Sequence, residues 1–299
     1  MFEQVSIIGC GLIGSSIFKS LKKNKSVKKI ITFDNDQSVS EIIKKENLSD
    51  KIVSSSEEAV SNADLVLIST PLSSFESAID SIKKNLKSGS ILTDTSSVKK
   101  GADLIVKKMN LKNISWIPSH PVAGTEKSGP RAGSSDLFKD RWTILTPDSK
   151  IKDSDVKKLS LFWESMGSKV KIMSAEDHDK ILSLTSHLPH VIAYNIVRTA
   201  MGDDEKTKKD VIRYSAGGLR DFTRIAASNP IMWKDIFIDN SDLIIDGINK
   251  FSKSLDEFKK AITEKDSKKL LEIFKKSKEF REAIIKAGQD TDEAGFGRK

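Results

Sequence analysis

The chain is poor in the residues that mark several classes of protein. It contains one cysteine, so neither an intramolecular disulfide nor a cysteine-rich zinc site can form. No apolar run approaches the roughly 18–20 residues of a membrane span, and the N-terminus lacks the basic segment of a secretory signal. Seven prolines and 16 glycines in 299 residues are too few for a fibrous or low-complexity chain. We therefore expect a soluble, cytoplasmic protein of about two domains that does not interact with membranes.

Basic residues are in modest excess, with 50 Lys and Arg against 42 Asp and Glu. The dense basic run at 22–29 lies between a helix pattern and a strand pattern, and no aromatic residue interrupts it. A solvated loop explains this run better than a patch for the phosphate backbone. We expect no nucleic-acid partner, whereas a mildly basic surface would attract an anionic substrate.

The spacing of apolar residues along the sequence changes near residue 172. Before it, expected strands at 5–8, 30–33, 65–68, 91–93, 114–117, 142–145 and 169–172 alternate with expected helices at 12–23, 38–45, 73–85 and 153–165. This alternation predicts βαβ units and a mostly parallel sheet. After it, apolar residues at i, i+3 and i+4 predict helices over 175–201, 231–262 and 266–287. We expect an α/β domain over 1–172 and an all-helical domain over 173–299.

Three glycines follow the first expected strand in the pattern GxGxxG. Gly9 would permit a tight turn, Gly11 lacks the Cβ that would block a pyrophosphate, and Gly14 lets the next helix pack closely. The N-terminus of that helix offers N–H groups to phosphates. Asp34 ends the second strand, twenty positions after Gly14, which is the spacing of a ribose 2′-hydroxyl ligand. No Arg or Lys follows at 35–37 to pair with a 2′-phosphate, so the pattern favours NAD over NADP.

The motif thus predicts a Rossmann-type domain that binds NAD, and a similar fold without a nucleotide is the alternative. Cys10 is expected to be a small packing residue rather than a nucleophile. The expected cofactor-binding residues are Gly9, Cys10, Gly11, Leu12, Ile13, Gly14, Asp34, Ser69, Thr70 and Pro71.

Four histidines are candidates for the base that a nicotinamide enzyme needs. His120 follows an expected strand, so it should lie at the carboxyl end of the sheet, in an irregular loop rich in proline and glycine. His187 and His190 share a helical face; we expect a packing role for the first and a substrate-facing role for the second. Further ligands of a metal are missing around them, so no metal site is expected. His178, in an acidic run, is expected to be a cap or surface residue.

A second cluster combines two glycines with two arginines. Arg220 and Arg224 are four residues apart and can share a helical face. The planar guanidinium suits a substrate carboxylate, and an ion pair to Asp221 or a helix end is the alternative.

These motifs occur together and in a fixed order. The chain carries DTSSVK at 94–99, HPVAGTE at 120–126, SHLPH at 186–190 and DFTR at 221–224, after the glycine loop. Over most of 4–240 it resembles the prephenate/arogenate (cyclohexadienyl) dehydrogenase family of tyrosine biosynthesis. Members of this family oxidatively decarboxylate prephenate to 4-hydroxyphenylpyruvate, or arogenate to tyrosine, as hydride leaves ring C4 for the nicotinamide.

The resemblance implies roles for individual residues. His120 would be the catalytic acceptor for the 4-hydroxyl, Ser97 would position that hydroxyl, and Arg224 would bind the substrate, held by Asp221 and Glu126. The implied lining of the substrate pocket is Thr125, Glu126, His190, Gly217 and Trp233. The resemblance also implies a homodimer through the helical half, which could complete the pocket.

Two other functions are compatible with the glycine loop. A β-hydroxyacid dehydrogenase with a Rossmann and a helical domain would use a lysine on a helix as its acid/base. An NAD-sensing binding protein would need none of His120, Ser97 and Arg224.

Asp34 makes the choice of cofactor testable. Replacing the carboxylate by Asp34→Ser, combined with an added Arg, should relax the preference for NAD, because the repulsion toward a 2′-phosphate is removed. Rates with NAD and NADP measure the effect. An unchanged preference would mean that the ribose is held elsewhere.

Overall fold

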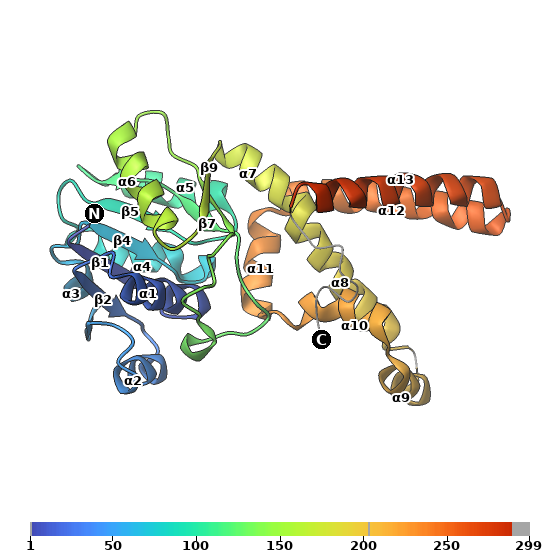
Figure 1. Cartoon of the computed structure of the whole chain (residues 1–299), viewed down its shortest axis with the longest axis horizontal. Coiled ribbons are helices and arrows are strands. Elements are labelled where there is room, and N and C mark those ends of the chain that lie inside the picture. The colour runs from blue at the N-terminus through green and yellow to red at the C-terminus, as the bar shows by residue number, and fades with distance from the viewer. Residues whose placement is uncertain (1, 203, 289–299) are drawn as a thin grey trace. The chain divides into compact units, whose positions relative to one another are not determined.

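Six parallel strands form the central sheet, in the order β3-β2-β1-β4-β5-β6 (Figure 1). The computed structural model describes residues 2–202 and 204–288. The strands are β1 (Gln4–Ile8), β2 (Lys29–Phe33), β3 (Lys51–Ile52), β4 (Leu65–Ile68), β5 (Ile91–Asp94) and β6 (Ser115–Trp116). The strand order reverses between β1 and β4, which opens a crevice at their carboxyl ends. The predicted α/β class with a Rossmann-type, mostly parallel sheet is confirmed.

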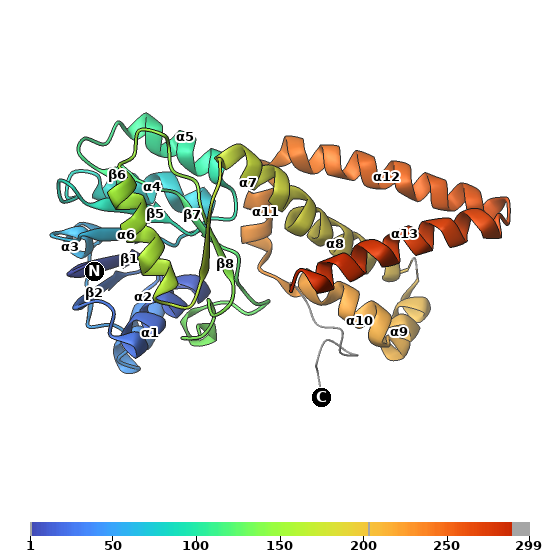
Figure 2. The same ribbon diagram turned by 45° about the horizontal axis from the view of Figure 1, so that its top comes forward.

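Helices cover both faces of this sheet (Figure 2). They are α1 (Leu12–Asn24), α2 (Gln37–Lys45), α3 (Ser56–Val60), α4 (Phe75–Ile82), α5 (Lys99–Met109) and α6 (Asp153–Glu164). Alternate strand residues face opposite sides. Leu65 and Leu67 belong to the core that α1 and α6 share, whereas Val66 and Ile68 belong to the core with α3, α4 and α5. Because both faces are buried, such strands read as continuous apolar runs in the sequence.

A second sheet of three strands follows β6 in the chain. β7 (Ser119–Pro121) is antiparallel to β8 (Trp142–Leu145), and β8 is parallel to β9 (Lys169–Ile172). The prediction of an irregular loop around His120 was therefore wrong, because His120 lies in β7 and pairs with Ile144 of β8 in the sheet. β7 lies at the edge of the sheet, where a proline without an N–H is tolerated.

Besides β7, the strand β3 and the helices α3 and α5 were not predicted before residue 172. The strand β3 and the helix α3 are two and five residues long, too short to show a period. Helix α5 contains Gly101, a residue that weakens a helical pattern. A Cβ at Gly101 would lie 2.0 Å from a carboxylate oxygen of Asp239, so close packing accounts for the glycine.

Helices replace strands after β9, as predicted. They are α7 (Ala175–Leu182), a π-helical stretch (Ser183–His187), α8 (Leu188–Ala200), α9 (Glu205–Tyr214), α10 (Gly217–Thr223), α11 (Pro230–Asp239), α12 (Ser241–Thr263) and α13 (Ser267–Lys286). Pro189 cannot donate the helical hydrogen bond four residues back, which accounts for the widened turn before α8. No helix in the described ranges has both the length and the apolar composition of a membrane span.

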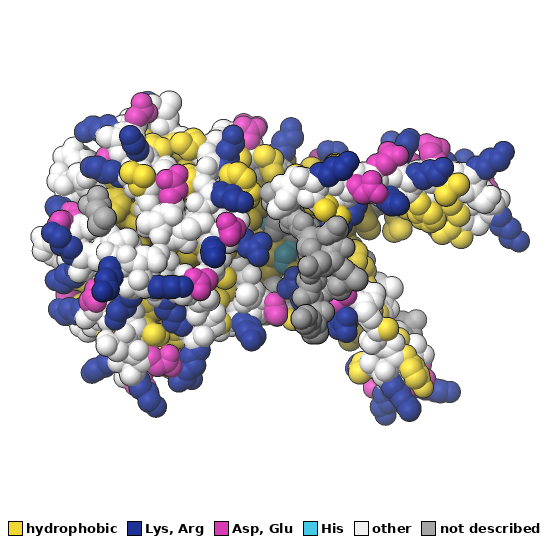
Figure 3. Space-filling model, viewed as in Figure 1, with side chains coloured by type: hydrophobic (Ala, Val, Ile, Leu, Met, Phe, Trp, Pro, Cys, Tyr) yellow, Lys and Arg dark blue, Asp and Glu magenta, His cyan; other side chains and the backbone are white. Residues whose placement is uncertain are grey.

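The chain divides into two compact units, Met1–Ile244 and Ile245–Lys299. In the second unit, α12 and α13 form an antiparallel pair, with the rings of Phe258 and Phe274 6.1 Å apart. Leu255, Leu271 and Phe280 are more than half exposed. Figure 3 shows apolar side chains gathered along one side of this pair.

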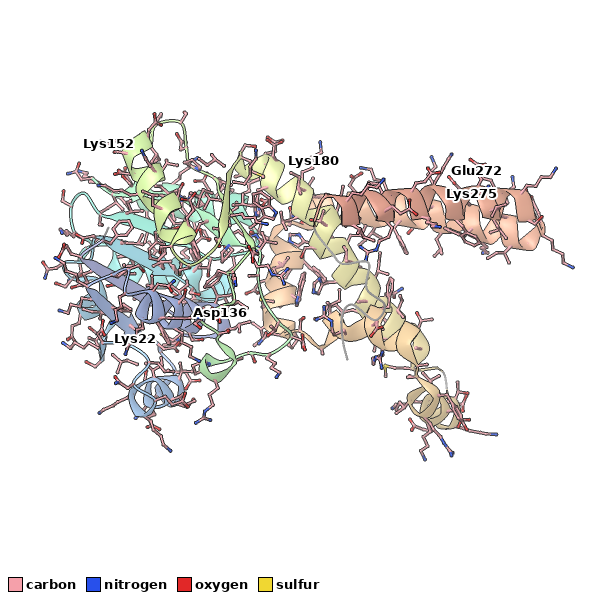
Figure 4. The ribbon with its side chains drawn as sticks, viewed as in Figure 1. Lys22, Asp136, Lys152, Lys180, Glu272 and Lys275 are labelled. Atoms are coloured by element: carbon pink, nitrogen blue, oxygen red, sulfur yellow. The ribbon has the colours of Figure 1, made fainter. Side chains whose placement is uncertain are left out.

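The other side of α13 is charged. Glu272, labelled with Lys275 in Figure 4, accepts a hydrogen bond of 2.8 Å from Lys276. The helix pair is therefore amphipathic, and the helix predicted over 266–287 is present as α13.

Candidate functional site

The glycine loop lies at the point where the strand order reverses. Gly9 has a φ of +91°, and a Cβ on it would lie 2.7 Å from the carbonyl oxygen of Ser69. A Cβ on Gly14 would lie 2.1 Å from the carbonyl oxygen of Gly9, so α1 packs directly against the turn. A Cβ on Gly11 would meet nothing within 4 Å. Two glycines are thus required by packing, and the third faces open space where a ligand can approach.

The N-terminus of α1 has no side-chain cap, although the side chain of Asp36 caps α2. N–H groups at this helix end are available to an anion. The Asp34 carboxylate lies beside them, because it accepts hydrogen bonds from the backbone N–H of Cys10 (2.6 Å) and of Asp36 (2.9 Å). An open glycine, an uncapped helix end and an adjacent carboxylate fit the pyrophosphate and ribose of NAD.

The segment after β4 forms the other side of the crevice. The Ser69 N–H donates to Ile8 at 2.7 Å, and the Ser69 hydroxyl accepts from Thr95 at 3.0 Å. Thr70 is half-buried and Pro71 is exposed. Cys10 is fully buried in the core and burial raises its pKa, which agrees with the expected packing role.

His120 stands in a chain of buried hydrogen bonds. Its Nδ1 lies 2.8 Å from Nε2 of His178, and Nδ1 of His178 lies 2.7 Å from the Asp179 carboxylate. That carboxylate also accepts from the backbone N–H groups of Lys99 (2.8 Å) and Lys100 (2.9 Å), at the start of α5. The expectation of a surface role for His178 was wrong: its side chain is fully buried. An acidic stretch of sequence is usually solvated, but here two of its residues face inward.

The hydrogen bonds that run from His120 through His178 to Asp179 determine which ring nitrogens carry protons. The carboxylate can only accept, so Nδ1 of His178 carries a proton and its Nε2 can accept one from His120. The Nε2 of His120 is then left with a lone pair. Burial, reinforced by His178 and Lys99, holds the pKa of His120 well below its ordinary value, so the ring is neutral at neutral pH. Burial would raise the pKa of Asp179, but hydrogen bonds from His178, Lys99 and Lys100 outweigh it and keep the carboxyl ionised.

A buried ion pair between Lys99 and Asp94, the last residue of β5, contacts the backbone of β7. Nζ of Lys99, which is fully buried, lies 2.5 Å from the Asp94 carboxylate and 2.6 Å from the carbonyl oxygen of Ser119. Asp94 also accepts from the Ser119 N–H at 3.0 Å. Burial lowers the pKa of Lys99, against the attraction of Asp94. The pair fixes the residue before His120, and breaking it would leave an uncompensated buried charge.

The second group of predicted residues surrounds Arg224. Its Nη1 donates to Glu126 at 3.1 Å, and its positive charge lowers the pKa of His190, after the larger effect of burial. The His190 ring stacks on Trp233 with centroids 3.5 Å apart, and its Nδ1–H donates to the carbonyl oxygen of Ser186 at 2.8 Å. The predicted pair of Arg224 with Glu126 is therefore present.

A continuous set of contacts joins this group to His120. Trp233 meets the edge of His187 with centroids 6.2 Å apart. Nδ2 of Asn240 lies 3.1 Å from both Nδ1 of His187 and the carbonyl oxygen of Asp179, whose carboxylate contacts His178. Ser97 is half-buried in the bend between β5 and α5. An imidazole from the first half and a guanidinium from the second thus belong to one site.

The remaining predicted residues lie on the rim of this site. Gly217 is the first residue of α10, where a Cβ would contact Arg220 and Asp221 at 3.7 and 3.9 Å. Asp221 accepts from Nε of Arg220 at 3.1 Å. Thr125 is exposed and its hydroxyl accepts from the Lys127 N–H at 3.3 Å.

The loop that carries Thr125 and Glu126 is anchored on α1. Nζ of Lys19 donates to the carbonyl oxygens of Pro130 (3.1 Å) and Gly133 (2.9 Å). Asp136, labelled in Figure 4, pairs with Lys23 at 2.7 Å. The helix that begins at the glycine loop therefore also holds the loop of the substrate site.

Several residues of the site were not singled out in the sequence: Asp94, Lys99, Asp179 and Asn240. The first two are the end residues of the motif DTSSVK at 94–99, and their opposite charges were a detectable signal. The sequence around Asp179 and Asn240 contained no signal that would have identified these two residues. Among the residues that the structure describes, no group of three His, Cys, Asp or Glu side chains is placed to hold a metal ion.

Comparison with known proteins agrees with this arrangement. The family model "Prephenate dehydrogenase, nucleotide-binding domain" matches residues 17–172, and "Prephenate dehydrogenase, dimerization domain" matches residues 174–276. The cyclohexadienyl dehydrogenase of Zymomonas mobilis is 38% identical over 286 residues, which cover 95% of this chain and 97% of that protein. The prephenate dehydrogenase of Bacillus subtilis is 31% identical over 95% of this chain and 76% of its own length.

A solved structure shares the fold over nearly the whole chain. The prephenate dehydrogenase of A. aeolicus, in complex with hydroxyphenyl propionate and NAD+, superposes with a TM-score of 0.86 at 32% identity. The match covers 95% of this chain and 99% of that chain.

The glycines provide a matched pair of variants. Gly14→Ala should lower the free energy of unfolding by about 1–3 kcal/mol, because its Cβ overlaps the Gly9 carbonyl. Gly11→Ala should unfold at nearly the wild-type temperature yet bind NAD more weakly, because its Cβ fills space left for the pyrophosphate. Thermal unfolding and NAD titration separate the two effects. Normal NAD binding by Gly11→Ala would show that the pyrophosphate lies elsewhere.

Proposed function

The chain belongs to the prephenate dehydrogenase family, and from this premise we propose that it oxidatively decarboxylates prephenate or arogenate in tyrosine biosynthesis, with NAD as the hydride acceptor. The single observation that carries the proposal is the buried chain from Asp179 through His178 to His120. It leaves a lone pair on His120 in the same site as Arg224.

The residues of the crevice fit NAD. The loop 9–14 and the uncapped start of α1 would hold the pyrophosphate, and the Asp34 carboxylate would accept from a ribose hydroxyl. Ser69, Thr70 and Pro71 would line the opposite wall. Bound NAD would supply the acceptor for the hydride of ring C4.

His120 is proposed to take the proton of the 4-hydroxyl. As hydride leaves C4, that oxygen becomes a carbonyl and its proton passes to Nε2 of His120. The proton on Nδ1 can then move toward His178, where the Asp179 carboxylate stabilises the imidazolium. After carbon dioxide leaves, the proton returns to the phenolate oxygen. General-base assistance of this kind contributes about 10²–10⁴-fold, and Ser97 would hold the hydroxyl in line.

Arg224 is proposed to bind the side-chain carboxylate that the product retains. A strong ion pair to the departing ring carboxylate would stabilise the reactant and so oppose loss of carbon dioxide. Aromatisation drives that step, so this carboxylate needs no residue to bind it. The Glu126 carboxylate, 3.1 Å from Arg224, would orient the guanidinium before substrate binds. His190, Trp233, Thr125 and Gly217 would line the rest of the pocket.

The helical half is proposed to form a homodimer, with the domain boundary at residue 172. The dimerization-domain match begins at residue 174, and Ile212, Phe222, Ile238, Leu271 and Phe280 are all more than half exposed. Large apolar side chains exposed in such numbers usually mark an interface. The proposed location is the cytoplasm, the compartment that supplies NAD.

A direct assay tests the function. Purified protein should reduce NAD with prephenate or arogenate and release carbon dioxide, and NADP should be a poorer acceptor. Short 3-hydroxy acids are the control substrates, and turnover of those alone would refute the proposal.

His120→Asn should lower kcat by roughly 10²-fold or more, because the lone pair that receives the hydroxyl proton is lost. NAD affinity should be unchanged, since the ring lies outside the glycine loop. Steady-state kinetics and NAD titration measure the two quantities. An unchanged kcat would remove His120 from the mechanism.

Arg224→Ala should chiefly raise KM for the substrate, by roughly ten- to a hundredfold, the value of a charged hydrogen bond. Arg220→Ala is the matched control and should leave KM near the wild-type value, because its side chain is 70% exposed and pairs with Asp221. Analogues that lack one carboxylate identify the group that Arg224 binds. An equal loss with both analogues would contradict the assignment.

A further inference from the structure

Asn240 lies between α11 and α12, is buried, and has no role in the proposed mechanism. Its Nδ2 lies 3.1 Å from the backbone carbonyl oxygen of Asp179 and 3.1 Å from Nδ1 of His187. Because a carbonyl can only accept, this atom of Asn240 must be the NH₂ group. One N–H donates to Asp179 and the other to His187, so the proton of the neutral imidazole is on Nε2.

The orientation of His187 depends on this amide. The ring is fully buried, and burial lowers its pKa to about 4, so it is uncharged at neutral pH. Its Nε2 has no hydrogen-bond partner among the residues that the structure describes. Asn240 therefore supplies the hydrogen bond that selects both the tautomer and the rotation of the ring.

The ring of Trp233 lies nearly perpendicular to that of His187, at 77° with centroids 6.2 Å apart, and stacks on His190. Within the described part of the chain, the indole Nε1 of Trp233 has no hydrogen-bond partner that could fix the ring. Val98 and Ile236 pack against the indole, but apolar contacts are not directional. The perpendicular contact with His187 is directional, because the faces and edges of aromatic rings carry opposite partial charges.

We propose that Asn240 is a positioning residue for the aromatic wall of the substrate pocket, which consists of Trp233 and His190, and that it acts through His187. The inference rests on the proposed function, in which Trp233 and His190 line this pocket. The amide orients the imidazole, the imidazole orients the indole, and the indole carries the stacked ring of His190.

The same amide links the aromatic wall to the catalytic base. The carbonyl that accepts from Asn240 belongs to Asp179, whose carboxylate accepts from His178. Nε2 of His178 in turn lies 2.8 Å from Nδ1 of His120. One buried side chain thus fixes the substrate wall relative to the residue that takes the proton.

Asn240→Leu keeps a branched side chain but removes the donors. It should raise KM for the substrate roughly three- to tenfold, the value of one aromatic contact. The kcat should stay within about threefold of wild type, and NAD affinity should be unchanged, because the base and the glycine loop are intact. An unchanged KM, or a fall in kcat alone, would overturn the proposal.

Asn24→Leu is the matched control. The Asn24 amide also donates to a backbone carbonyl, that of Ser165 at 2.7 Å, but it lies at the opposite end of α1 from the glycine loop. This variant should keep the wild-type KM. An equal rise in KM in both variants would mean that the effect comes from a general loss of stability, and would overturn the proposal.

A double-mutant cycle shows whether the effect passes through His187. His187→Phe keeps a planar ring but has no nitrogen that Asn240 can hold. In this background Asn240→Leu should change KM by less than about twofold. The same rise in KM with and without the imidazole would contradict a role through His187.

NMR spectroscopy tests the contacts without turnover. Nitrogen spectra of histidine-labelled protein should show His187 neutral at pH 7 with its proton on Nε2, and Asn240→Leu should lose this preference for one tautomer. The indole N–H resonance of Trp233, assigned by its absence in Trp233→Phe, should shift in Asn240→Leu and not in Asn24→Leu. A proton on Nδ1 in the wild type, which needs no variant to fold, or an unshifted Trp233 resonance would overturn the inference.

The two proposals fail in different ways. Absence of turnover with both prephenate and arogenate would refute the proposed function. The resonances of His187 and Trp233 would still decide whether Asn240 holds the aromatic wall.

Discussion

A single carboxylate, that of Asp179, joins α7, the first helix after β9, to the start of α5. Asp179, from the start of the helical half, accepts two backbone N–H bonds at the start of α5 and a third bond from His178. The helix dipole and these charge-assisted bonds offset the cost of burying the negative charge. Because α5 begins two residues after Ser97, the same contact locates the serine relative to His120. Loss of this carboxylate would separate the elements that make the site.

The buried charges around this contact are arranged so that the imidazoles remain neutral. Lys99 balances Asp94 and contacts the backbone of Ser119, while Asp179 is balanced by N–H groups. Burial lowers the pKa of His120, His178 and His187 alike. Neutral rings with assigned protons provide a lone pair on His120 and a donor on His187. The chemistry of the site therefore depends on hydrogen-bond order rather than on net charge.

Much of this arrangement was predictable from local sequence. The parallel sheet, the glycine loop and the pairing of Arg224 with Glu126 follow patterns in which neighbouring residues or a family motif carry the information. The errors share one cause. His178 reads as a solvated residue, and residues 119–121 read as a loop, because in each case the partner lies far along the chain: His120 for the first and β8 for the second. Asn240, joined to His187 across 53 residues, gave no local signal.

The sequence by itself determined the class of fold and the cofactor, and it predicted the groups that we propose to carry the chemistry. Apolar periodicity and glycine sterics are properties of a few adjacent residues, so they can be read without coordinates. Only the tertiary structure decided which nitrogen of each imidazole holds its proton, and which buried charges compensate one another. Those properties depend on distances between residues remote in the chain, and a shift of one ångström in such a distance makes or breaks a hydrogen bond.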